Sequence, residues 1–233
     1  MTNLTASVQL RIEAYDLKLQ EEQNKLTMLR AQIRPHSFLN AITTISNMTY
    51  MNKPEEIRSY INSFAKFIRY MLNVSAAWTT VEDEIQQIGN YLKMQQNRFP
   101  ESVSLTVEYP PELAKTRIPF MVLYTLVENS IKHAMTLYEP LEIRVSCHRV
   151  EDEGFQGICL TAEDNGVGFA QDVLDKLADV STNVLNTKEH LGLSNVRYTL
   201  HLLYGRDDLL RASNRITGGA HVELWIPDEE KTK

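Results

Sequence analysis

Apolar side chains recur at alternating steps of four and three residues over the first part of the chain. The series begins at Val8 and Ile12, ends at Leu29 and Ile33, and has Glu22 as one polar member. This is the spacing of a heptad seam, which needs a second helix to cover it. A single solvated helix is the alternative, but the seam favours a parallel coiled-coil dimer that continues an upstream signalling helix.

Two more helical patterns follow. Pro54 is expected in the turn before a helix whose apolar positions form a broad stripe over residues 57–71. Thr79 and Thr80, each with an acidic residue three positions later, are N-cap candidates for another helix that runs to about Arg98. Two helices per chain, doubled in a dimer, predict a four-helix bundle.

Beyond Val103 the pattern changes to short β-type segments mixed with helices. The predicted strands are 104–108, 141–149, 157–163, 209–214 and 220–226, and the predicted helices are 120–135 and 191–204. One sheet and one helical layer make an α+β sandwich. The chain therefore divides into three regions, residues 1–28, 29–99 and 100–233.

Composition narrows the class of protein. With 233 residues, 43% of them hydrophobic, the chain is long enough for one or two domains with real cores. A net charge of −6 gives no basic footprint and argues against nucleic acid as a direct partner. No apolar run approaches the roughly 18 residues of a membrane span, and no signal peptide is evident, so we expect a cytoplasmic module.

The two cysteines, Cys147 and Cys159, lie in apolar, strand-like runs without metal-ligand spacing. We expect reduced core residues, and a disulfide between them is the alternative.

A polar set interrupts the predicted helix 120–135. Residues 126, 127, 130 and 131 share one helical stripe, which leaves Glu128, Asn129, Lys132 and His133 on another face. Carboxamide and carboxylate oxygens suit a hard cation, and cationic side chains suit phosphate oxygens. The plain alternative is the solvated face of an amphipathic helix.

Three glycine-bearing turns follow. Residues 164–168 read Asp-Asn-Gly-Val-Gly at a strand end, where the Asp can accept a hydrogen bond from an exocyclic amine and the glycines admit a close ligand. Gly192 precedes a helical run, and Gly218 and Gly219 precede the last strand. Each one alone is also compatible with an ordinary turn or hairpin.

Taken in order, these four sites resemble the N, G1, G2 and G3 boxes of the GHKL (Bergerat-type) ATP-binding fold. Residues 29–42, with Gln32-Ile33-Arg34-Pro35-His36 followed by Asn40, resemble the phosphoacceptor box of LytS/YesM-like bacterial sensor histidine kinases. Residues 90–99 resemble the linker helix of that subfamily, and residues 118–120 the approach to its N box. The resemblance covers roughly residues 29 to 227.

The resemblance implies an enzyme of a two-component system. It would autophosphorylate His36 with ATP and Mg²⁺, then pass the phosphoryl group to an Asp of a response regulator receiver domain. Residues 1–28 would form a signalling coiled coil, 29–99 the dimerisation and phosphotransfer helices, and 100–233 the catalytic domain. A homodimer is implied, as is a membrane anchor in a segment upstream of this chain.

Roles for the reacting groups also follow from the resemblance. His36 would be the nucleophile, with Asn40 one helical turn on and Pro35 kinking the helix at the acceptor. Asn129 would bind Mg²⁺, and Glu128 would polarise His36 or accept its proton.

The remaining implied contacts to ATP are spread over the four boxes. Lys132 and His133 would face the phosphates, Asp164 the adenine amine with Asn165 beside it, Gly166 and Gly168 the base and lid hinge, Gly192, Leu193 and Asn195 the lid, and Gly218 and Gly219 the floor of the adenine pocket. Lys188 and Arg197 are further candidates for phosphate contacts, with plain surface charges as the alternative.

Three positions depart from the family pattern. Residues 37–39 are Ser-Phe-Leu instead of Phe-Leu-Phe, residues 124–125 are Tyr-Thr instead of Gln-Pro, and His190 replaces a lid glycine. We expect the first two to alter packing and the third to stiffen the lid. The alternatives are a degenerate GHKL scaffold that signals by dimer conformation and an anti-sigma-factor-like ATPase or serine kinase.

Overall fold

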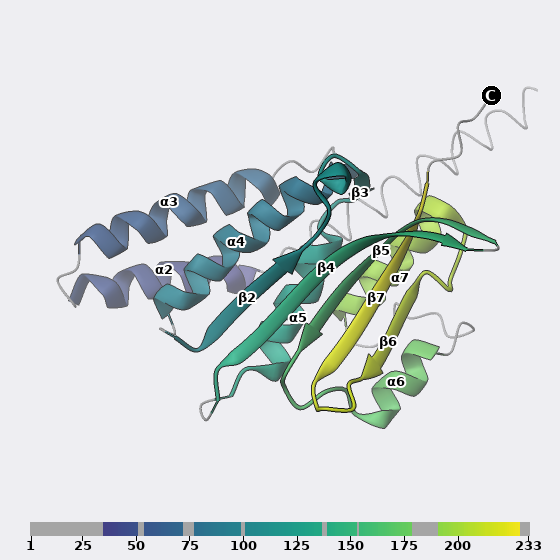
Figure 1. Cartoon of the computed structure of the whole chain (residues 1–233). Coiled ribbons are helices and arrows are strands. Elements are labelled where there is room, and N and C mark those ends of the chain that lie inside the picture. The colour runs from purple at the N-terminus through teal and green to yellow at the C-terminus, as the bar shows by residue number, and fades with distance from the viewer. Residues whose placement is uncertain are drawn as a thin grey trace, which may run out of the picture.

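A computed structural model describes seven stretches of the chain (Figure 1). These are residues 35–50, 54–71, 77–98, 101–136, 139–152, 154–178 and 191–228. The coiled coil predicted over residues 8–33 lies outside them, as do Lys188 and His190.

Helices α2 (Pro35–Tyr50) and α3 (Pro54–Met71) lie side by side at one end of the molecule (Figure 1). Pro54 is the first residue of α3, whereas the sequence placed it in the preceding turn. A proline fits there because the first helical N–H has no intrahelical partner. Of the predicted stripe, Tyr60 and Phe67 are buried, whereas Ile61 is 44% exposed.

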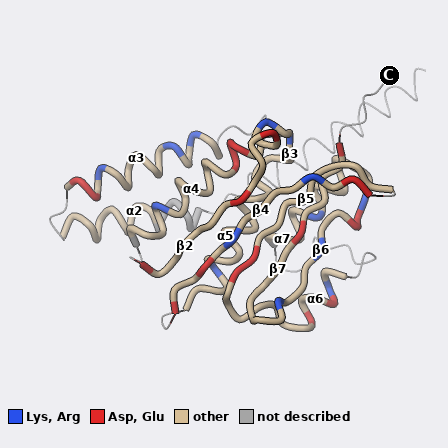
Figure 2. Tube along the Cα trace, viewed as in Figure 1, with Lys and Arg blue, Asp and Glu red and all other residues tan. Residues whose placement is uncertain are grey.

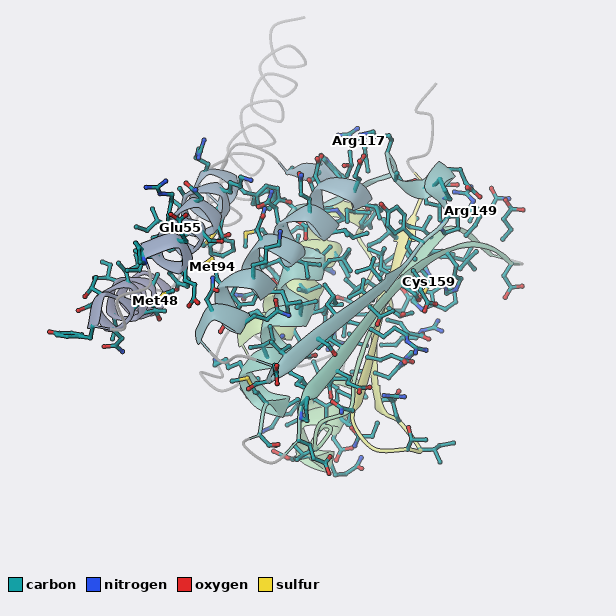
Figure 3. The ribbon with its side chains drawn as sticks, turned by 60° about the vertical axis from the view of Figure 1, so that its left-hand side comes forward. Met48, Glu55, Met94, Arg117, Arg149 and Cys159 are labelled. Atoms are coloured by element: carbon teal, nitrogen blue, oxygen red, sulfur yellow. The ribbon has the colours of Figure 1, made fainter. Side chains whose placement is uncertain are left out.

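Helix α4 (Val81–Arg98) joins the helix pair to the rest of the molecule. Thr80 caps it, because its Oγ1 accepts a hydrogen bond of 3.1 Å from the Asp83 N–H and donates one of 2.7 Å to the Asp83 carboxylate. Val81 and Ile88 pack into the large core under the sheet. Met94 belongs instead to a smaller apolar cluster that also contains Met48 of α2, and both are labelled in Figure 3.

The sheet confirms the predicted α+β class. Its strands, in spatial order, are β2 (Val103–Glu108), β4 (Leu141–Asp152), β5 (Phe155–Asp164), β7 (Ala220–Pro227) and β6 (Leu210–Asn214). β2 and β4 run parallel, and the other neighbours are antiparallel. Helices α5 (Val122–Ala134), α6 (Gln171–Ala178) and α7 (Leu191–Tyr204) cover one face (Figure 1).

Four short elements were absent from the sequence prediction. They are β1 (Trp78–Thr80), β3 (Arg117–Pro119), the 3₁₀ turn η1 (Pro111–Leu113) and α6. β1 pairs antiparallel with β3, so Thr79 lies opposite Ile118. Strands of three residues carry too few side chains for a periodic pattern, and their partners are distant in the sequence.

The two cysteines point to opposite faces of the sheet. Cys147 is in register with Leu160 on the helix-covered face, and Cys159 with His148 on the other face (Figure 3). Both are buried and free, as expected. Burial raises the pKa of the Cys147 thiol to about 11 and that of Cys159 to about 12, so both stay protonated.

Charges of both signs are interspersed over the described elements (Figure 2). Helix α3, for example, has Glu55 and Glu56 in its first turn and Arg69 in its last, an arrangement that complements the helix dipole. Within the described stretches, every helix is too short or too polar to cross a membrane.

Glu84 of α4 is fully buried beneath the first turn of α5. Its carboxylate accepts hydrogen bonds from the backbone N–H groups of Met121 at 2.6 Å and Tyr124 at 3.1 Å, and from the Tyr70 hydroxyl of α3. The first N–H groups of a helix lack intrahelical partners, and an anion there is favoured by the helix dipole. One side chain thus connects three helices.

Burial dominates the ionisation of this pair. It raises the pKa of Glu84 to about 6, against the hydrogen bonds from Tyr70 and the α5 backbone, which lower it. Burial and the neighbouring Glu84 carboxylate also raise the pKa of Tyr70 above its ordinary range, so the phenol remains a donor.

We expect Glu84 to give the stability a pH dependence of defined sign. Between its ordinary pKa of 4.5 and about 6, the folded state binds a proton that the unfolded state has lost. Relative to a Glu84→Gln variant, the free energy of unfolding should therefore fall by about 2 kcal/mol as the pH rises from about 4.5 to about 7. Urea unfolding of both proteins measures this. If the wild type instead became more stable relative to Glu84→Gln as the pH rose, the hydrogen bonds to Glu84 would outweigh the effect of its burial on the pKa.

Candidate functional site

A cavity of about 270 Å³ opens between α5, α6, the N-terminal end of α7 and the sheet. Apolar side chains form much of its wall, namely Leu126, Ala134, Ala162, Phe169, Val173, Leu193 and Val222. The polar groups on the wall are Asn129, Ser130, Lys132, His133 and Asp164. An apolar slot with a few convergent polar groups is the usual form of a small-molecule site.

Asp164 is the most strongly held polar group of the cavity. It ends β5, is 3% exposed, and receives hydrogen bonds on both carboxylate oxygens. The N–H groups of Gly166 and Ala220 donate to Oδ1 at 3.0 Å each, and the Ser130 hydroxyl donates to Oδ2 at 2.8 Å. Three donors from three segments fix the plane of the carboxylate.

The carboxylate sits where three chain segments approach closely. A Cβ on Gly219 would lie 1.9 Å from the carbonyl oxygen of Asp164, and one on Gly166 would lie 2.2 Å from the Cβ of Ala134. Arg215 also donates to the Asp164 carbonyl oxygen at 2.9 Å. These glycines are therefore required by packing around the site.

The loop after β5 is tied to β6. Asn214 accepts a hydrogen bond of 2.7 Å from the Phe169 N–H and donates one of 2.9 Å to the Phe169 carbonyl oxygen. Gly168 has φ +74 and passes so near Asn214 that a Cβ would lie 2.5 Å from its Oδ1. The two-way bond holds Phe169 at the cavity wall.

Asn129 lies against Gly192, and both line the cavity. A Cβ on Gly192 would lie 2.6 Å from Asn129 Oδ1, so any larger residue there would displace the Asn129 side chain. Asn129 Nδ2 is buried and has no hydrogen-bond partner among the described residues. A buried amide without a partner is costly and marks a place where a ligand can supply one.

The cavity suits a magnesium ion that arrives with its own oxygen ligands. Among the described residues no cluster of three or more His, Cys, Asp or Glu side chains is placed to hold a metal. Mg²⁺ is usually held by one or two protein oxygens together with substrate phosphates and water. The Asn129 carboxamide beside the cavity fits that pattern, and Lys132 and His133 line the same wall.

The predicted site residues fall into two groups. Those on the cavity wall are Asn129, Lys132, His133, Asp164, Gly168, Gly192 and Leu193. Glu128, Asn165, Gly166, Asn195, Gly218 and Gly219 lie off the wall. Asn165 instead binds the start of β4, with its Oδ1 accepting from Glu142 N–H at 2.8 Å and its Nδ2 donating to the Pro140 carbonyl oxygen at 3.1 Å.

Arg197 is neither a surface charge nor part of the cavity wall. Its side chain is 6% exposed, and Nη1 donates a hydrogen bond of 3.0 Å to the carbonyl oxygen of Leu177, which ties α7 to the end of α6. The expectation of a surface charge was therefore wrong, whereas a contact with phosphate stays a prediction. The burial of Arg197 was not foreseen because α6, to which it is hydrogen-bonded, was not predicted.

Sequence reasoning also missed residues that hold the site. Ser130 was assigned to the buried stripe of α5, although a hydroxyl among apolar positions was a signal that it needs a partner. Asn214 and the backbone of Ala220 gave no such signal, because their contacts with Phe169 and Asp164 span about fifty residues of sequence.

His36 and Asn40 lie four positions apart near the start of α2. Residues at this spacing share one face of a helix. The structure describes the backbone of α2 at these positions, and the roles of both residues stay predictions.

Comparison with known families divides the chain in two. The family model described as "Histidine kinase" matches residues 24–103. The model described as "Histidine kinase-, DNA gyrase B-, and HSP90-like ATPase" matches residues 115–230, the part that contains the cavity.

Individual relatives agree. The sensor protein LytS of Enterococcus faecalis is 29% identical over 235 residues, which cover 99% of this chain and 38% of that protein. The sensor histidine kinase YesM of Bacillus subtilis is 25% identical over 220 residues, which cover 94% and 36%. The chain thus spans well under half of the length of these relatives.

Among solved structures, the histidine kinase domain of a blue-light activated histidine kinase from Erythrobacter litoralis is 14% identical, with a TM-score of 0.43. The match covers 89% of this chain and 95% of that one.

Gly218 and Gly219 offer a matched test of the close approach to Asp164. Both have positive φ, +91 and +94, so alanine should strain either one by about 1–2 kcal/mol. A Cβ at Gly218 would meet nothing within 4 Å, whereas one at Gly219 would overlap the Asp164 backbone. Gly219→Ala should therefore lower the free energy of urea unfolding by at least about 2 kcal/mol more than Gly218→Ala. Equal losses would contradict the packing described above.

Proposed function

The chain belongs to the LytS/YesM-like sensor histidine kinases, and we propose that it is the kinase part of a two-component sensor. In this proposal it transfers the γ-phosphoryl group of ATP to His36 and then to an Asp of a response regulator receiver domain. The observation that carries the proposal is the buried Asp164 carboxylate, held by three donors in a cavity that also contains the Asn129 carboxamide.

The nucleotide base would bind at the Asp164 end of the cavity. An ionised carboxylate only accepts hydrogen bonds, so it attracts the exocyclic amine of adenine and repels the keto oxygen of guanine. The apolar walls formed by Leu126, Phe169 and Val222 suit a flat ring. The adenine base of ATP is therefore the ligand that matches this end.

The phosphates would lie along the C-terminal half of α5, near Lys132 and His133, whose charge or hydrogen-bonding groups suit phosphate oxygens. Asn129 would hold Mg²⁺, which would offset the negative charge that builds up on the phosphates during transfer. The Gly192 end of α7 would form the adjoining part of the lid, because its backbone lies against Asn129.

His36 would act as the nucleophile. A neutral imidazole nitrogen attacks the γ-phosphorus, a P–N bond forms, the bond from phosphorus to the bridging oxygen breaks, and ADP leaves. The proton of the imidazole would pass to Glu128, one residue before Asn129 on α5. Asn40 would hydrogen-bond the ring or the incoming phosphoryl group from the next helical turn.

Dimerisation would proceed through residues 1–28 as a coiled coil and residues 29–99 as paired helical hairpins, with residues 100–233 as the catalytic domain. Part of α3 supports this assignment, because Ile61 is apolar and 44% exposed on a helix whose other side is already packed. The chain would be the cytoplasmic part of a sensor anchored to the membrane elsewhere.

Incubation of the chain with γ-labelled ATP and Mg²⁺ tests the proposal. We expect label that is stable to alkali and labile to acid on the wild type, and a loss of at least about 100-fold in His36→Gln, because the P–N bond has no other acceptor. His148→Gln, a change of an exposed histidine on β4, is the matched control and should label as the wild type does.

Other results would redirect the assignment. Undiminished label on His36→Gln would move the acceptor elsewhere and favour an ATPase or serine kinase. Nucleotide binding without any label would favour a scaffold that signals by dimer conformation. Absence of nucleotide binding at millimolar ATP would exclude both kinase readings.

A further inference from the structure

Ser130 is the one side chain among the described residues that donates to the Asp164 carboxylate. Its hydroxyl reaches Oδ2 at 2.8 Å, whereas both donors to Oδ1 are backbone N–H groups, those of Gly166 and Ala220. The backbone donors belong to the turn after β5 and to the start of β7, so they are present whatever side chains stand there. The Ser130 hydroxyl is therefore the one donor of these three that a side-chain substitution can remove, and it is the donor on Oδ2.

The position of Ser130 on α5 is unusual for a serine. It follows Asn129 directly and lies on the stripe that buries Leu126 and Ile131. Serine is a weaker helix former than alanine, and a hydroxyl among apolar side chains requires a hydrogen-bond partner. Its partner is the carboxylate at the end of the cavity, and Ser130 itself lines the cavity wall.

The number of lone pairs on the Asp164 carboxylate determines how many donors it can bind, from the protein and from a ligand together. A carboxylate has about four acceptor sites, two on each oxygen. The two backbone donors occupy Oδ1, and Ser130 occupies one site on Oδ2, which leaves one site on Oδ2 for a ligand. With the Ser130 hydroxyl in place, the carboxylate cannot rotate without losing a charge-assisted hydrogen bond.

From this geometry we infer that Ser130 is a positioning residue for base recognition. It holds Asp164 Oδ2 in the orientation that accepts one hydrogen bond from a 6-amino purine, and so increases the preference for a nucleotide with that amine. The inference rests on the proposed function, because it assumes that the cavity binds the base of a nucleotide.

A role in folding alone makes a different prediction. If Ser130 only satisfied the buried Asp164, its loss would weaken the binding of any purine nucleotide to the same extent. If it positions the carboxylate, its loss would weaken binding only of nucleotides that carry the 6-amino group. Comparison of ATP with purine riboside triphosphate, which lacks any 6-substituent, separates the two.

The experiment measures the dissociation constants of the whole chain for the Mg²⁺ complexes of both nucleotides, by competition with a fluorescent nucleotide. For Ser130→Ala we expect the Kd for ATP to rise about tenfold. This corresponds to the loss of the hydrogen bond between the 6-amino group of the base and the charged Asp164 carboxylate. The Kd for purine riboside triphosphate should change less than about twofold. The preference for the amine then falls by the ratio of these changes.

Two further variants guard against trivial results. Ser130→Thr keeps the hydroxyl and should retain the preference for ATP over purine riboside triphosphate. Ser130→Cys has a similar volume but only a weak donor, and should lose that preference. The cysteine variant therefore tests the inference even if Ser130→Ala fails to fold. Ser146→Ala is the matched control, because Ser146 hydrogen-bonds the Thr161 hydroxyl at 2.7 Å on the face of β4 and β5 that points away from the cavity. It should bind both nucleotides as the wild type does.

The possible outcomes test the role of Ser130 separately from the proposed kinase function. Equal weakening of both nucleotides by Ser130→Ala and Ser130→Cys, or no weakening of either, would overturn the positioning role and leave the nucleotide site intact. A wild type that binds neither nucleotide would overturn the proposed function, and the inference with it.

Discussion

The buried carboxylate of Glu84 is the interaction on which the arrangement of the two halves depends. It accepts hydrogen bonds from the first turn of α5 and from Tyr70 of α3, while its own backbone belongs to α4. Helix α5 begins at an unusual point, since Met121 before it has a left-handed conformation with φ +64 and no side-chain cap. Glu84 supplies the missing acceptor and so fixes the start of the helix that carries Asn129 and Ser130.

Aromatic packing reinforces this connection. Tyr124 of α5 lies 5.2 Å from Phe67 of α3 and 5.0 Å from Tyr91 of α4, measured between ring centres. Tyr124 joins the small apolar cluster of the helix pair. Offset and edge-on aromatic pairs add to the burial of their surfaces. A displacement of α3 would therefore shift the first turn of α5, which directly precedes the cavity residues Leu126 and Asn129.

The cavity itself is formed where α5 meets the turns at one end of the sheet. Asp164 lies at one end of it, where the turn after β5, the start of β7 and α5 each contribute a donor to its side chain. Gly219 permits an approach to the Asp164 backbone that any Cβ would block, and Gly192 brings α7 against the Asn129 side chain. The Asp164 carboxylate is thus held where several segments approach closely, which is how a site remains pre-organised without many ion pairs.

The sequence by itself determined the α+β class, every strand of the main sheet and the α5 and α7 helices, because these depend on local periodicity. It also identified the motifs at Asn129, Asp164 and Gly192, because these are recognised by residue type and spacing along the chain. The tertiary structure alone decided that Ser130 serves Asp164, that Arg197 is buried against α6, and that Glu84 caps α5. Those contacts join residues from about twenty to forty positions apart, and no local pattern reports which distant group a buried polar side chain will meet.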